Sequence, residues 1–306
     1  MSSLRPAVED YLTMRRALGY KLDREGTLLP RFVDFIAGRD EQHVSVDAAL
    51  AWATLPASSA MLWSSRLRVA RGFATYMHAI DPVNELISVD LLPSQARRGT
   101  PYLYSPEQID ALMHAAGTLR TSLRVATMQT LLGLLAVTGM RIGEAIGLDL
   151  DDFDAHDGFL VVRGAKFGKS RELALHPSTV EAVQRYLRRP DRPAPAKETK
   201  ALMLTSVGTR LGTKDVQRTF VTLRRRAGIR ADAMSRQPRL HDIRHSFTVS
   251  TVLDVYKSGK DPGNTLALLA TYLGHVNPAS TYWYLSAAPE LMQQAADRLE
   301  RHTEQR

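Results

Sequence analysis

Apolar residues recur at helical spacing from residue 5 to about residue 90, and this periodicity constrains the fold more than any other feature of the chain. No part of this region alternates polar and apolar residues as a half-buried strand would. The apolar positions of the three expected helices are Val8, Tyr11, Leu12, Met14 and Leu18, then Leu28, Phe32, Phe35 and Ile36, then Leu62, Val69, Phe73 and Met77 between Ser58 and His78. Residues 1–92 are therefore predicted to form a helical N-terminal domain.

The pattern breaks between Leu91 and Tyr104, where prolines, a glycine and two arginines replace the apolar repeat. We predict an interdomain linker over residues 93–104. The run Ser105-Pro106-Glu107-Gln108 then restarts a helix, because a serine cap, an early proline and early acids are typical of a helix start. A second domain is expected over residues 105–306, with an apolar helix from about Met128 to Val137 buried at its centre.

The hydrophobic period changes within this second domain. Phe159–Val162 and Arg171–Leu175 are typical of two short strands, joined through the glycine-containing residues 164–169. Helices return from Ser178, and the last is expected between Pro289 and about Arg301. Its apolar side (Leu291, Ala295 and Leu299) could dock on another subunit. The predicted fold class is mainly α with a small β-sheet.

Composition narrows the class of partner. The chain has 306 residues, a formal charge of +8 and a pI near 9.8, which favours a polyanion such as nucleic acid. It contains no cysteine, so disulfides and thiolate chemistry are excluded. The first residues do not read as a signal peptide, and the longest apolar run, Leu131–Met140, is too short to cross a bilayer. A soluble cytoplasmic protein with no membrane partner is expected.

Six side chains supply what cleavage of a phosphodiester needs without a metal. The non-bridging oxygens need donors in a forked geometry, which arginine provides. An attacking phenol needs a proton acceptor, and the leaving sugar oxygen needs a general acid. The candidates are Arg141, Lys166, His241, Arg244, His275 and Tyr284. The pattern offers no metal cage, so we expect neither a metal nor a cofactor.

Two tyrosines compete for the role of nucleophile. Asn277-Pro278 favours the start of a new short helix, which would carry both of them. Tyr282 lies two residues before Tyr284 and would point about 200° away from it, so only one of the two can face the arginines. The spacing from His275 favours Tyr284.

Further basic residues are candidate DNA contacts. On the third expected helix these are Arg66, Arg68 and Arg71, which either face solvent or bind phosphates. Near the expected strands, Lys169 and Arg171 are predicted to contact the DNA backbone or to remain solvated. The general acid that protonates the leaving sugar oxygen is expected to be Lys166, and Lys169 is the alternative for that role.

Four segments follow one another in a specific order: Thr138–Glu144, Lys166–Arg171, His241–His245 and Leu273–His275, with Tyr284 after them. They resemble, in turn, the first arginine box, the β-hairpin lysine, the His-x-x-Arg box and the later histidine of the tyrosine recombinase (phage integrase) family. Each segment alone is a weak signal, but their order and spacing over residues 105 to 287 are specific. The chain is on this basis identified as resembling that family.

The resemblance implies a role for each candidate. Arg141 and Arg244 would bind the scissile phosphate, and Tyr284 would attack it to form a 3′-phosphotyrosine. Lys166 would protonate the leaving 5′ oxygen. His241 would act as a base or an orienting donor, and His275 would donate to a phosphate oxygen. Glu144 would hold Arg141 or His241 in place.

The resemblance also implies an architecture and a function. It implies a helical core-binding (SAM-like) domain and an α+β catalytic domain that close on DNA as a C-shaped clamp. The expected function is site-specific recombination at inverted-repeat core sites in double-stranded DNA, by a homotetramer or by a hetero-tetramer with sister recombinases. Nucleoid association is expected with it. The alternatives are a type IB topoisomerase-like enzyme and a catalytically silent DNA-binding relative.

Overall fold

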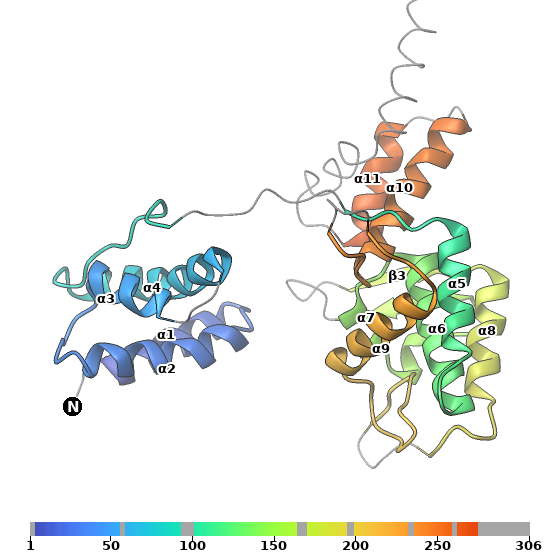
Figure 1. Cartoon of the computed structure of the whole chain (residues 1–306), viewed down its shortest axis with the longest axis horizontal. Coiled ribbons are helices and arrows are strands. Elements are labelled where there is room, and N and C mark those ends of the chain that lie inside the picture. Colours follow the sequence, from blue (N-terminus) through green and yellow to red (C-terminus); the bar gives the residue numbers. More distant parts are fainter. Residues whose placement is uncertain are drawn as a thin grey trace, which may run out of the picture. The chain divides into compact units, whose positions relative to one another are not determined.

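The protein is described by a computed structural model that places residues 4–55, 59–92, 101–163, 170–194, 199–231, 236–258 and 262–274. The chain divides into two compact units, Met1–Gly99 and Thr100–Arg306 (Figure 1). The predicted class, mainly helical with a small β-sheet, is confirmed. The DNA-binding role of the first domain and the catalytic role of the second stay predictions, as does the C-shaped clamp. Several predictions concern residues outside the described ranges: Lys166, Lys169, His275, Tyr282, Tyr284 and the C-terminal helix.

The N-terminal unit is built from four helices: α1 (Leu4–Ala17), α2 (Asp23–Ala37), α3 (Val46–Thr54) and α4 (Ala60–Ile80). Their apolar sides form one core, in which the rings of Phe32 and Trp52 lie 4.9 Å apart. Helix α3 is not among the expected helices; it is short, and Ser45 caps it by accepting from the backbone N–H of Ala48. No helix in the described ranges is long and apolar enough to span a bilayer.

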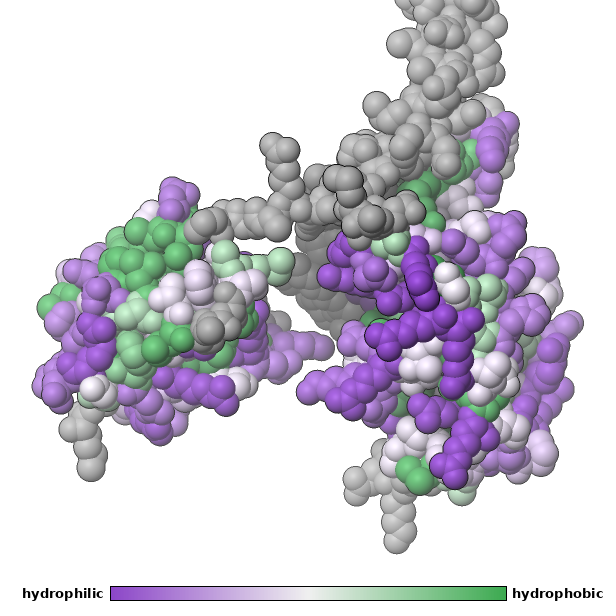
Figure 2. Space-filling view, viewed as in Figure 1, coloured by the Kyte–Doolittle hydropathy of each residue, from purple (hydrophilic) through white to green (hydrophobic). Residues whose placement is uncertain are grey.

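Some apolar residues of the helical repeat lie at the surface instead of in this core. Met14, Leu18 and Leu62 are exposed because they lie at helix ends. Met14 is in the last turn of α1, Leu18 directly follows α1, and Leu62 is in the first turn of α4. The segment that follows α4 adds an apolar area on the face shown in Figure 2, with Val83, Leu86 and Val89 exposed.

The second unit is organised around α6 (Ser122–Thr138), which is buried along most of its length, as its apolar sequence predicts. The described helices around it are α5 (Pro106–Ala116), α7 (Ile142–Gly147), α8 (Pro177–Leu187), α9 (Thr213–Arg226), α10 (Asp242–Lys257) and α11 (Pro262–Leu273), with a 3₁₀ turn at Leu150–Asp152. The predicted start of α5 is confirmed: Ser105 and Gln108 form a reciprocal capping box, and Pro106 occupies the first helical position.

A small antiparallel sheet lies beside these helices in the order β1 (Phe153–Asp154), β2 (Phe159–Val162) and β3 (Arg171–Ala174). The two predicted strands are β2 and β3. Their register pairs Leu160 with Leu173 and Val162 with Arg171. The residues between Val162 and Arg171 therefore connect two paired strands, and Arg171 starts the returning strand.

Helices α10 and α11 project together from one end of the unit (Figure 1). They share a small apolar cluster that is separate from the main core and contains Val249, Val252, Leu266, Leu269 and Leu273. Helix α10 also packs against α6, and α11 packs against α10 and β3. The C-terminal end of α11 is thus brought to the sheet and to the turn that follows α6.

Candidate active site

Arg141 is positioned by the turn that ends α6. Gly139 has a φ of 59°, in the left-handed region, and a Cβ there would lie 2.3 Å from Cδ1 of Phe247. Only glycine fits this turn without strain or a clash. Two residues later the backbone of Arg141 is extended and precedes the first residue of α7. The guanidinium of Arg141 therefore projects from a fixed point between two helices.

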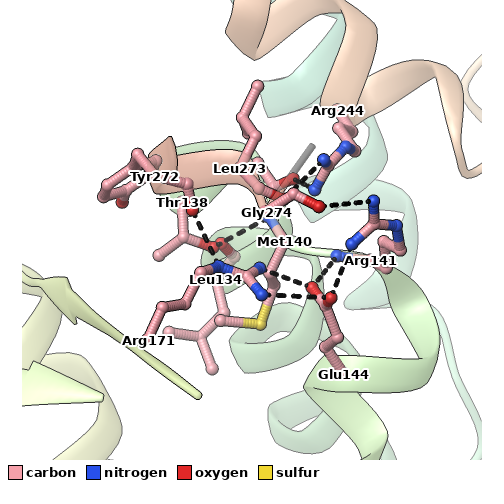
Figure 3. Close-up of polar contacts among 11 residues, drawn as sticks. Leu134, Thr138, Met140, Arg141, Glu144, Arg171, Arg244, Tyr272, Leu273 and Gly274 are labelled. Carbon is pink, nitrogen blue, oxygen red and sulfur yellow. Dashed lines mark hydrogen bonds and ion pairs between the residues drawn. The ribbon is translucent and has the colours of Figure 1, made fainter. Parts of the chain in front are cut away.

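Glu144 lies in the first turn of α7 and binds two arginines. It accepts from the backbone N–H of Arg141 (2.8 Å), from Nη1 of Arg141 (2.8 Å), and from Nη1 and Nη2 of Arg171 (3.2 and 2.7 Å; Figure 3). Burial of the carboxyl opposes ionisation, but these donors, led by Arg171, lower the pKa of Glu144 from 4.5 to about 2. The group is therefore ionised at neutral pH and orients the guanidinium of Arg141.

Arg244 lies in the first turn of α10, with 2% of its surface exposed. Its Nη1 donates to the carbonyl oxygen of Gly139 (2.8 Å) and its Nη2 to that of Leu273 (2.8 Å). A buried cation needs such partners, because desolvation without them is costly. The side chain joins the turn after α6 to the end of α11.

Three guanidiniums meet the last turn of α11 (Figure 3). Arg171 Nε donates to the carbonyl oxygen of Tyr272 (2.7 Å), Arg244 Nη2 to that of Leu273 (2.8 Å), and Arg141 Nη2 to that of Gly274 (3.3 Å). The final carbonyls of a helix lack intrahelical partners and carry the negative end of the helix dipole, so cations are favoured there. The chain is fixed by three positive charges up to the residue before His275.

His241 directly precedes α10, one turn before Arg244. Desolvation, followed by the positive charges of Arg244 and Arg141, lowers the pKa of His241 below 6.5. His241 as a residue is exposed to solvent, and the positive charges of the two guanidiniums lower its pKa in the same direction as burial does. The imidazole is therefore neutral near pH 7, as a proton acceptor must be.

Asp242 and His245 lie behind this histidine. Asp242 is fully buried and accepts from the backbone N–H of Arg239 (2.7 Å) and from Nη2 of Arg236 (2.9 Å). The ring of His245 is buried and meets that of His241 edge to face, with centroids 4.9 Å apart. These two residues support the start of α10 and do not enter the arginine cluster.

The structure brings Arg141, Glu144, His241 and Arg244 together, from segments that are far apart in the sequence. Among the described residues there is no group of His, Asp or Glu side chains arranged to hold a metal ion.

Two candidate DNA contacts have different positions from those predicted. The side chain of Arg171 is 11% exposed and is bound to Glu144 and to the Tyr272 carbonyl oxygen, so it is not a solvated side chain, and its contact with a DNA backbone stays a prediction. The guanidinium of Arg66 stacks 3.9 Å from the centre of the Trp52 ring and donates to the Trp52 carbonyl oxygen at 2.7 Å. On the same helix Arg68 is exposed and Arg71 is half-buried, and their DNA contacts stay predictions.

The inward position of Arg171 was available from the sequence. Side chains two residues apart on a strand share a face, and Leu173 is an obvious core residue. Arg171 therefore had to lie on the buried face of β3, where an arginine requires a carboxylate partner.

Comparison with known proteins agrees with these motifs. The family model described as "Phage integrase family" matches residues 103–290. The protein named "Putative integrase/recombinase y4rB" of Sinorhizobium fredii is 42% identical over 313 aligned residues, covering 100% of both chains. A second one from the same organism, "Putative integrase/recombinase y4rE", is 32% identical over 95% of this chain and 94% of its own. The chain belongs to the phage integrase family, and the predicted enzyme class, a tyrosine-type DNA recombinase, is confirmed.

Solved structures support the fold. The Tn1549 transposon integrase in complex with transposon right end DNA has a TM-score of 0.64 at 18% identity, covering 96% of this chain and 98% of that one. A lambda integrase dimer bound to a core site has a TM-score of 0.59 at 15% identity, covering 92% and 76%. At such identities these matches concern the arrangement of the backbone.

Proposed function

We propose that this protein is a site-specific recombinase of a mobile element, which cuts and rejoins DNA strands through a tyrosine linked to the 3′ phosphate. One observation carries the proposal. Arg141 and Arg244, from the ends of two different helices, donate to the adjacent carbonyl oxygens of Gly274 and Leu273, directly before His275. Two forked donors that meet beside a pair of oxygens suit the non-bridging oxygens of one phosphate.

The proposed reaction has two reversible transesterifications. The phenol oxygen of Tyr284 attacks phosphorus, the bond from phosphorus to the 5′ oxygen breaks, and Lys166 gives that oxygen a proton. Neutral His241 receives the proton of the phenol. Arg141, Arg244 and His275 stabilise the added negative charge on the phosphate oxygens. The 5′ hydroxyl of a partner strand then attacks the phosphotyrosine, so rejoining requires no external energy source.

DNA is the proposed partner, and inverted-repeat core sites and a tetramer are proposed with it. The net charge of +8 supports a polyanionic partner. The related XerH recombinase has been solved bound to a palindromic difH substrate, and the Tn1549 integrase with transposon DNA. A recombinase that exchanges strands between two duplexes needs one active subunit for each of four strands. Association with the nucleoid would follow from binding DNA.

The test is a covalent trapping experiment on duplexes from the DNA that flanks the gene, nicked close to each inverted repeat found there. A nick lets the short cleaved fragment diffuse away, so that the phosphotyrosine accumulates. Wild-type protein should form an adduct in EDTA. Tyr284→Phe should form none, and Tyr282→Phe, the matched control, should form as much as wild type. Adduct formation by Tyr284→Phe would refute the assigned nucleophile.

Strand joining separates recombination from relaxation. Wild-type protein should exchange strands between two duplexes that carry the same site. Relaxation of plasmids of any sequence, with no joining of duplexes, would favour a type IB topoisomerase. DNA binding without any adduct would favour a silent relative.

A further inference from the structure

Arg171 is the arginine of the cluster that the proposed mechanism does not use. It is the first residue of β3, on the strand that returns from the connection containing Lys166. Its side chain is 11% exposed, although three polar nitrogens at the end of a long side chain would ordinarily reach solvent. Its position therefore requires an explanation from its partners.

All three nitrogens of its guanidinium have acceptors. Nη1 and Nη2 form a fork on the two oxygens of Glu144, at 3.2 and 2.7 Å, and Nε donates to the carbonyl oxygen of Tyr272 at 2.7 Å. Gly274 lies against the same group, since a Cβ on that glycine would come within 3.1 Å of Nη1. A fork on a carboxylate fixes both direction and distance, which a single contact would not do.

The carboxylate that Arg171 holds is the one that orients Arg141. Glu144 binds Arg141 through its backbone N–H and Nη1, both at 2.8 Å, on the oxygens that also face Arg171 (Figure 3). Without Arg171, the buried carboxylate would lose half of its donors and would be free to turn. The direction of the Arg141 guanidinium would then no longer be fixed.

The same guanidinium holds the last turn of α11, after which the chain continues to His275 and Tyr284. Arg171 thus joins three parts of the active centre: the strand next to the Lys166 connection, the carboxylate of Arg141, and the turn before His275. No other described arginine contacts both Glu144 and the end of α11 from the sheet.

We propose that Arg171 is a positioning residue of the strand-cleavage reaction, which acts through Glu144 and the Tyr272 carbonyl and makes no contact with DNA. This inference rests on the proposed function. It predicts that loss of Arg171 slows the chemical step and leaves DNA affinity unchanged. A contact to the DNA backbone would have the opposite signature.

The test compares Arg171→Gln with wild type in single-turnover adduct formation on the nicked duplex defined by the trapping experiment. The rate should fall about 10–100-fold, the range found when groups that orient the ligands of a metal site are removed. The dissociation constant for the same duplex should change less than about threefold, and the slope of log affinity against log salt should not change, because that slope loses about one for each lost phosphate contact.

Arg210 provides a matched control. It also joins a helix end to a carboxylate: its Nη1 donates to the carbonyl oxygens of Ile146 and Leu148 at 2.9 and 3.1 Å, and its Nη2 pairs with Asp149. It touches neither Glu144 nor α11 in the described structure. Arg210→Gln should lower the melting temperature and leave the cleavage rate of the folded protein unchanged.

Two further variants test the route of action. Glu144→Gln combined with Arg171→Gln should cleave no more slowly than the slower single variant, because both single changes break one network. Arg171→Lys keeps the charge but cannot supply the fork, so it should restore the melting temperature more fully than the rate. Hydrogen exchange in residues 262–274 should accelerate in Arg171→Gln and not in Arg210→Gln.

Three results would overturn the inference: weaker DNA binding with a smaller salt slope, an unchanged cleavage rate in folded Arg171→Gln, or fully additive losses in the double variant. Failure of the proposed function is a different result, because wild-type protein would then form no Tyr284-dependent adduct on any of the flanking duplexes.

Discussion

Replacing Glu144 with glutamine should remove a pH-dependent part of the stability of the catalytic unit. Glu144 has 11% of its side chain exposed and is ionised between Arg141 and Arg171. Its pKa is lowered from 4.5 to about 2 in the folded protein. An acid with a lowered folded pKa contributes stability that is fully present above pH 4.5 and is lost as the pH falls towards 2.

The magnitude follows from that difference. At about 1.4 kcal/mol for each pH unit, the change from 4.5 to about 2 corresponds to about 3–4 kcal/mol. Glutamine does not titrate, so the difference in unfolding free energy between wild type and Glu144→Gln should be larger at neutral pH than in acid by this amount. Roughly half of the pH-dependent part should be gone by about pH 3.

The assay is urea unfolding of the whole chain, with pulsed hydrogen exchange of peptides from α6 and α10 reporting on the catalytic unit alone. Asp191→Asn is the control, because that carboxyl also has a pKa of about 2 through Arg189 and Ser122 but lies at the surface. Its effect should be small and should disappear in about 0.5 M NaCl, where exposed pairs are screened. A difference between wild type and Glu144→Gln that is the same at every pH would refute the assignment of Glu144 as the buried anion.

Three further outcomes are expected. Gly139→Ala should destabilise the catalytic unit and abolish adduct formation, because the added Cβ would collide with Phe247 at a left-handed turn. Urea unfolding measures the first effect and covalent trapping the second. A folded and active variant would contradict this prediction. Leu269→Ala should destabilise the α10–α11 cluster by about 2–5 kcal/mol in hydrogen exchange, while Leu268→Ala, at an exposed neighbouring position, should change it little. The rate of single-turnover cleavage should stay constant as the pH falls to about 6.5 and decrease only below that pH, because the pKa of His241 is lowered. A decrease that begins above pH 7 would contradict the role of His241 as the base.

Much of the fold was readable from the chain because local signals agreed with one another. The capping box at Ser105 and the apolar run of α6 each have one physical interpretation, and the structure contains both. Strand β1 could not be predicted in the same way, because a strand of two residues is too short to show an alternation of polar and apolar side chains. The order of the motifs was enough to name the family.

Side-chain partners were harder to predict than elements. Arg66 follows the helical pattern of an exposed face, yet its guanidinium lies on Trp52, a residue of a different helix that only tertiary packing brings near. For Arg171 the sequence predicts a DNA contact or a solvated side chain, because it is a basic residue close to Lys166. The alternation along β3 indicates that the side chain lies inward, but it does not identify the acceptors, Glu144 and the Tyr272 carbonyl, which are far away in sequence.

The separate cluster between α10 and α11 has a consequence for the order in which the protein opens. Because the buried leucines of α11 belong to the small cluster and, of its described residues, only Tyr272 also packs against the main core, α11 can undock at a lower free-energy cost than global unfolding. Undocking withdraws the carbonyl oxygens of Tyr272, Leu273 and Gly274 from Arg171, Arg244 and Arg141 in a single event. Under the proposed function, the arginines that bind the phosphate and the segment that leads to the proposed nucleophile would assemble in one cooperative transition, and a subunit in which α11 is displaced would be inactive.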